Sequence, residues 1–118
     1  MPDSILKTKS YDFALRTVNL SKHLVEEKRE FVLSKQVLRS GTSIGANIEE
    51  ANQAQSRRDF VHKLSVALKE AAETNYWLRL LRDSRTLDEA VANSMIDECK
   101  QIEKILTASI RTTKAGGA

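Results

Sequence analysis

Apolar residues recur along most of this 118-residue chain with the three- and four-residue spacing of amphipathic helices. Four segments carry this pattern, and they predict helices over about 10–27, 31–54, 57–83 and 87–112. Residues 1–9 precede the first segment and are expected to form an irregular arm. Residues 114–118 include two glycines and are expected to form a flexible tail. The pattern indicates a single domain of the all-α class, spanning residues 1–118.

Each predicted helix has an apolar stripe that would face a common core. The expected core residues are Phe13, Leu20 and Leu24, then Leu33, Val37, Ile44, Ile48 and Ala51, then Phe60, Leu64, Ala67, Ala71, Leu78 and Leu81, and finally Val91, Met95, Cys99, Ile102, Leu106 and Ile110. Only short stretches separate the segments, and helices joined by short turns pack against one another in alternating directions. We therefore expect an antiparallel up-down-up-down four-helix bundle.

Three of the expected helix starts carry a capping signal. Ser10 can cap the first helix, and Ser56 followed by Asp59 has the spacing of a capping box. Thr86 and Glu89 form a complete capping box before the fourth helix. These signals place the predicted boundaries at 10, 57 and 87.

Composition excludes several classes of protein. Hydrophobic residues make up 41% and charged residues 30%, which is too apolar for a disordered chain. No apolar run approaches the ~20 residues of a membrane span, and residues 1–10 lack the hydrophobic stretch of a signal peptide. We therefore expect a cytoplasmic protein without membrane contact. The single cysteine, Cys99, excludes a disulfide within one chain and any CxxC site.

The basic residues concentrate in one stretch of the chain. The net charge is +3, and residues 57–85 alone contain seven basic and four acidic residues. On a helical wheel, three of these side chains and a tyrosine fall within about 40° of one another, and one further arginine lies about 60° away. The candidate nucleic-acid or partner face is Arg58, His62, Lys69, Tyr76 and Arg79. Basic side chains with an interleaved aromatic can neutralise phosphates and stack a base, although a solvated helix face has the same composition.

The third predicted helix is apolar around more of its circumference than one bundle core requires, with Val66 and Trp77 extending the stripe. Excess apolar surface is typical of association, so we expect a homo-oligomer with Trp77 near the subunit contact; the alternative is a Trp lying on its own bundle. Small polar groups and two carboxylates flank the same stripes. The candidate structural or subunit-contact network is Ser43, Asn47, Glu50, Glu70, Glu73 and Trp77. Gly41 and Gly45, four residues apart, favour close approach of a neighbouring helix.

Catalytic patterns are missing from the sequence. A di-iron bundle needs a Glu-x-x-His motif on each of two helices, and no Glu here is followed by His at that spacing. Cys99 lies in a core stripe with no nearby His, and no phosphate-binding glycine loop occurs. We expect no catalytic residue, no cofactor, no metal and no small-molecule substrate.

The segment from Leu33 to Leu81 resembles a known family. The resemblance rests on the run SGTSIGANIEEA at residues 40–51, on Phe60, Lys63-Leu64 and residues 67–71, and on Glu73-Thr74 with Tyr76-Trp77-Leu78. These residues resemble the four-helix bundle proteins encoded within intervening sequences of bacterial 23S ribosomal RNA. The family also includes the accessory protein of diversity-generating retroelements.

The resemblance implies an antiparallel bundle that assembles as a ring-shaped homopentamer. It also implies RNA or an RNA-handling protein as a partner, because the retroelement accessory protein binds a reverse transcriptase and nucleic acid. The expected function is therefore a non-enzymatic oligomeric bundle with basic outer faces. The alternative is a protein-binding scaffold without nucleic-acid contact.

Overall fold

The computed structural model describes residues 2–116, and these residues form four helices and no strand, which confirms the all-α class. The helices are α1 (Pro2–Glu26), α2 (Leu33–Ala51), α3 (Arg57–Asp83) and α4 (Glu89–Gly116). The molecule is elongated, with dimensions of 49 × 21 × 19 Å. Within the described residues, no helix combines the length and the apolar character that crossing a bilayer requires.

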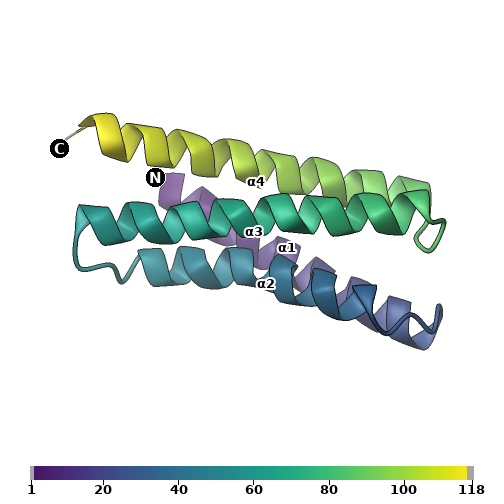
Figure 1. Cartoon of the computed structure of the whole chain (residues 1–118). Coiled ribbons are helices and arrows are strands. Elements are labelled where there is room, and N and C mark those ends of the chain that lie inside the picture. The colour runs from purple at the N-terminus through teal and green to yellow at the C-terminus, as the bar shows by residue number, and fades with distance from the viewer. Residues whose placement is uncertain (1, 117–118) are drawn as a thin grey trace.

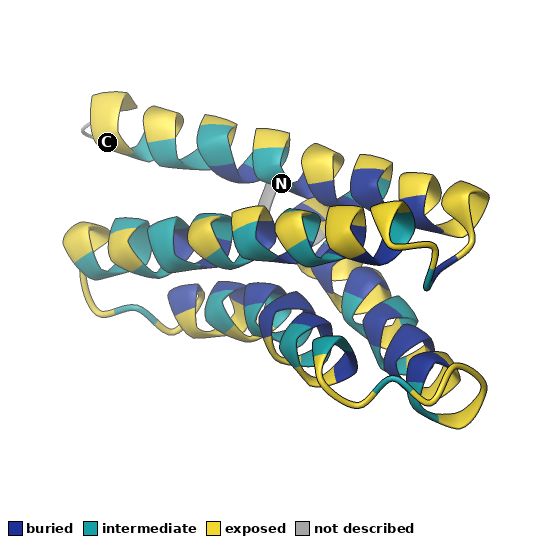
Figure 2. Cartoon of the chain, turned by 45° about the vertical axis from the view of Figure 1, so that its right-hand side comes forward, coloured by how far each residue is buried: buried dark blue, intermediate teal, exposed yellow. Residues whose placement is uncertain are grey.

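Helix α3 lies between α2 and α4, and α1 packs on α2 and α4 (Figure 1). Each helix ends at the end of the molecule where the next begins. Three polar contacts join α1 to α4: Arg16 donates to Glu98 over 2.7 Å and to Ser94 over 3.0 Å, and Lys9 donates to Gln101 over 3.3 Å. Figure 2 shows the dark blue, buried sides of the helices turned toward one another.

The core consists almost entirely of the predicted stripes. Phe13, Leu64 and Leu106 are fully buried, while Leu33, Phe60 and Ile110 are partly buried and packed against the same cluster. Val91 was predicted in the core and is 40% exposed, so that assignment is wrong. Ala92 and Ile96 are buried instead, on the same side of α4 as the predicted Met95 and Cys99.

The N-terminal prediction is wrong. Residues 2–9 are not an irregular arm but the first turns of α1. Proline suits the first turn of a helix because its missing N–H has no partner to lose there. Leu6 is 2% exposed and extends the core stripe seven residues before Phe13. Ser10 is therefore no cap; it is buried within α1, and its hydroxyl donates to the Lys7 carbonyl.

Helix α2 is shorter than the predicted 31–54. Its N-terminus is capped by the side chain of Glu30, which lies three residues before the helix begins. The Glu30 carboxylate accepts hydrogen bonds from the N–H groups of Val32, Leu33 and Ser34, at 3.2, 3.0 and 2.7 Å. Arg29 has a positive φ of 55°, which turns the chain between α1 and α2. Phe31 and Val32 therefore belong to the turn and not to the helix.

Helix α3 has the predicted bounds, and Ser56 Oγ accepts from the Asp59 N–H over 3.0 Å as the capping spacing indicates. Helix α4 begins at Glu89 and not at 87, because Asp88 accepts from the Val91 N–H in place of Thr86. The predicted end at 112 and the flexible tail from 114 are also wrong, since α4 continues to residue 116. Residues 117 and 118 of that tail lie outside the described part.

Candidate functional site

The candidate face lies on α3, and the candidate network has residues on both α2 and α3. A hydrogen bond of 2.8 Å from Thr74 to Ser40 sets the register between α3 and α2. The Cys99 thiol donates to the Ala71 carbonyl over 3.2 Å and sets the register between α4 and α3. Side chains on α3 therefore meet α2 on one side and α4 on the other.

The two α3 carboxylates form a polar network with an arginine of α2. The Arg39 guanidinium donates to Glu70 over 3.3 Å and also to Glu73. The Trp77 indole N–H donates to the same oxygen of Glu73, Oε2, over 3.0 Å. Three of the predicted network residues are thus brought together, and Arg39 is the residue that links them. Its charge compensates the two half-buried carboxylates.

The remaining predicted network residues lie elsewhere on α2. Ser43 donates to the Arg39 carbonyl over 2.6 Å, and the Asn47 amide donates to the Ser43 carbonyl over 2.8 Å. These bonds stay within α2 and do not reach Glu70 or Glu73. Glu50 forms a separate ion pair with Lys63 on α3 at 2.7 Å, and this hydrogen bond raises the pKa of Lys63.

An exposed aromatic cluster adjoins the network. Tyr76 and Trp77 meet edge to face with ring centroids 5.1 Å apart, and the Arg79 guanidinium lies 5.7 Å from the centre of the Tyr76 ring. Tyr76 is 47% exposed and Leu80 is 37% exposed. The register set by Ser40 and Thr74 places the first turn of α2 beside the last turns of α3.

Val32, in the turn just before α2, is 68% exposed, and this register places it near the last turns of α3. We call Val32, Tyr76, Trp77 and Leu80 the aromatic face. Exposed apolar side chains that gather in one place are typical of surfaces that bind another protein.

The predicted basic face runs along most of α3. Arg58, His62 and Lys69 are exposed along the first half of the helix. This half lies at the end of the molecule where α4 finishes (Figure 1). Tyr76 and Arg79 follow in the second half, where Arg79 lies over the Tyr76 ring and Tyr76 contacts Trp77.

A second row of basic residues, outside the predicted face, lies on α4, the helix that packs against α3. Its members are Lys100, Lys104, Arg111 and Lys114, all exposed. On a wheel of 100° per residue they fall within about 80° of one another, so their spacing alone could have revealed the row.

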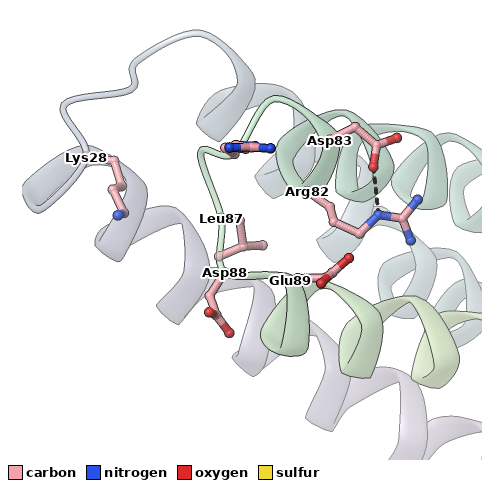
Figure 3. A pocket seen from close by; sticks show the side chains of 7 residues that line it. Lys28, Arg82, Asp83, Leu87, Asp88 and Glu89 are labelled. Carbon is pink, nitrogen blue, oxygen red and sulfur yellow. Dashed lines mark hydrogen bonds and ion pairs between the residues drawn. The ribbon is translucent and has the colours of Figure 1, made fainter.

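A hollow of about 600 Å³ lies at the connection between α3 and α4 (Figure 3). Its lining has cations and anions in equal number, and several are engaged. Arg82 donates to Asp83 over 2.8 Å and to Asn93 on α4 over 2.9 Å, and the Arg82 guanidinium lowers the pKa of Asp83. The Asp88 carboxylate caps α4. These contacts fix the loop and indicate a structural role.

Cys99 has the chemistry of a buried, unreactive thiol. Burial raises its pKa to about 12, with smaller contributions from Glu103 and Glu98. A nucleophilic cysteine needs the opposite shift, toward the thiolate. Over residues 2–116, no three His, Cys, Asp or Glu side chains gather in a group that could hold a metal ion.

Comparisons with known proteins agree on one family. The family model described as "23S rRNA-intervening sequence protein" matches residues 3–108. A crystal structure of a protein of unknown function from the S23 ribosomal protein family of Bacteroides thetaiotaomicron VPI-5482 is 54% identical to this chain. The similarity covers 95% of this chain and 100% of that one, with a TM-score of 0.94. No curated protein matches the chain.

Proposed function

Because the chain belongs to the family of 23S rRNA-intervening sequence proteins, we propose that it is a cytoplasmic, non-enzymatic oligomer that binds RNA or an RNA-handling protein. The subunit is an antiparallel up-down-up-down bundle, and the assembly is a homopentamer. The observation that carries the proposal is that α3 exposes basic side chains along its first half and apolar and aromatic side chains along its second half.

The aromatic face supports self-association. Val32 and Tyr76 are about half exposed or more, and Trp77 is only partly buried by its own subunit. Burying apolar surface stabilises a complex by roughly 25 cal/mol per Å², so a second copy covering these side chains would gain free energy. Trp and Tyr are also the residue types that contribute most at protein interfaces.

The basic residues of α3 support RNA binding. In the part of the chain that the structure describes, Arg58 and Lys69 have no carboxylate within ion-pair distance. An arginine or lysine without an acidic neighbour keeps its full attraction for phosphate. Several copies in one assembly would bind a single RNA together, which strengthens weak contacts through multivalency.

Oligomerisation is tested by the molar mass from light scattering. Val32→Glu and Leu80→Glu place charges in the aromatic face, and both positions are exposed enough for the subunit to fold. We expect each variant to lower the mass to that of smaller species. Val91→Glu is the control matched to Leu80→Glu, since Val91 is 40% exposed, close to the 37% of Leu80, but lies on α4. An unchanged mass in both variants would exclude the aromatic face as the subunit contact.

RNA binding is tested by titration with a structured RNA at several salt concentrations. Release of counterions predicts an affinity that falls steeply and log-linearly as salt rises. Absence of binding at low salt would remove the RNA part of the proposal. A partner protein recovered in a pull-down after nuclease treatment would then favour a protein-binding scaffold, for which the exposed aromatic face is also suited.

A further inference from the structure

We propose that α3 and α4 together form a binding surface for the phosphate backbone of double-stranded RNA. This inference rests on the proposed RNA binding and specifies its site and its ligand. We call the surface the basic face. It consists of Arg58, His62 and Lys69 on α3 and Lys100, Lys104, Arg111 and Lys114 on α4.

The register between the helices brings the two rows together. The hydrogen bond from Cys99 to Ala71 and the one from Arg82 to Asn93 show that α4 runs antiparallel to α3. By this register Lys104 lies opposite the turn that carries Lys69. The α4 row extends along about 21 Å, at 1.5 Å per residue, and packed helix axes lie about 8–10 Å apart. The two rows are thus a broad basic strip.

Few negative charges oppose this strip. None of its arginines or lysines has an ion pair among the residues described here. Glu103 is the carboxylate within it, and it is half-buried between the rows. Burial raises the pKa of Glu103, and the nearby Lys100 opposes this rise. The chain as a whole is only +3, so the positive charge is concentrated on this side.

The surface is also hollowed where a phosphate group would approach. Lys100, Lys104 and Arg111 line a shallow hollow of about 450 Å³ on α4, together with Glu103, Thr107 and Ala108. The small side chains leave room between the long basic ones. Lysine and arginine side chains around such a hollow can converge on one anion.

The seven residues of the basic face include no Trp, Tyr or Phe, which favours a duplex over a single strand. Single-stranded RNA is bound mainly by stacking its bases on aromatic side chains, whereas duplex RNA is recognised through phosphates and shape. The nearest aromatic on the outer side of α3 is Tyr76, and its ring already contacts Trp77 and Arg79. The basic face therefore offers charge without a stacking platform.

The test compares a duplex RNA with a single strand of the same length, using the full chain. We expect the duplex to bind more tightly. Lys100→Gln with Lys104→Gln should weaken duplex binding about tenfold near 0.1 M salt and reduce the salt slope by about 2. Lys22→Gln with Lys35→Gln is the control pair, because it removes the same charge from exposed sites on α1 and α2. This control pair should weaken duplex binding much less.

Glu103→Gln supplies a test in the opposite direction. Removing the one carboxylate from the basic face should tighten duplex binding by roughly two- to fivefold, the usual size of one charge interaction near a surface. A damaged fold would weaken binding, so a gain in affinity is specific to this site. Circular dichroism of each variant checks that the helices are intact.

The outcomes separate this inference from the proposed function. Duplex binding that is stronger than single-strand binding and lost with Lys100 and Lys104 supports the basic face. Binding that favours the single strand, or that falls equally in both lysine pairs, overturns it and leaves RNA binding in place. No binding of either RNA at low salt overturns both.

Discussion

Gly41 has no room for a side chain, because Thr17 of α1 lies directly against it. A Cβ at this position would be 2.6 Å from Thr17 Cγ2 and 2.8 Å from its Oγ1. Thr17 is fully buried, and its hydroxyl donates to the Phe13 carbonyl, so the side chain is held in place. The helices can approach this closely only with glycine here.

Gly41→Ala should therefore lower the free energy of unfolding by about 1–3 kcal/mol, the usual cost of overpacking a core. Gly45→Ala is the matched control, since a Cβ there would make an ordinary 3.4 Å contact with the Ser10 carbonyl. This control should be neutral or gain up to about 1 kcal/mol from helix propensity. Denaturant unfolding measures both, and equal effects would contradict the role assigned to Thr17.

Cys99 should not react with thiol reagents in the folded protein. Its pKa of about 12 leaves almost no thiolate at pH 8, and the side chain is fully buried. Ellman's reagent should label the chain in denaturant but not in native buffer. Fast labelling of the native protein would show that α3 and α4 separate readily.

The raised pKa of Cys99 also predicts that the folded protein loses stability at alkaline pH. The unfolded thiol ionises near 9, whereas the folded one keeps its proton to about 12. Ionisation therefore favours the unfolded chain, and stability falls as pH rises between these values. The melting temperature of Cys99→Ala, which cannot ionise, should fall less over this range than that of the unchanged protein.

At the scale of the elements, the N-terminus of α2 depends on a residue outside the helix. Val32 occupies the capping position and makes no side-chain cap, so the three bonds to Glu30 replace it. Glu30→Ala should cost about 1–2 kcal/mol of stability. Glu27→Ala, an exposed change in the same turn, should stay within about 0.5 kcal/mol. Similar losses in both would contradict capping by Glu30.

The element boundaries show where sequence reasoning succeeds. Ser56 and Asp59 lie three residues apart along the chain, and the start of α3 followed from them. Glu30 caps α2 from a position just after Arg29, whose positive φ no periodicity reveals. The start of α1 was misplaced because Ser10 resembles a cap, although burial against α2 assigns its hydroxyl to the helix interior.

At the scale of the whole molecule, self-association should be visible in thermal unfolding. If copies cover one another's aromatic faces, unfolding also separates the subunits, and the melting temperature rises by a few degrees per tenfold increase in concentration. The Val32→Glu variant should melt at a temperature independent of concentration. A flat dependence in the unchanged protein would contradict an assembly held by this surface.

The sequence by itself determined the all-α class, nearly all of the core and the bounds of α3. These properties follow from spacing along one helix, because side chains three and four positions apart share a face whatever surrounds them. The two surfaces of α3 were decided by the tertiary structure. Whether Glu73 meets Arg39, or Lys69 lies beside Lys104, depends on the register between helices, and that register is set by contacts such as Thr74 with Ser40 and Cys99 with Ala71.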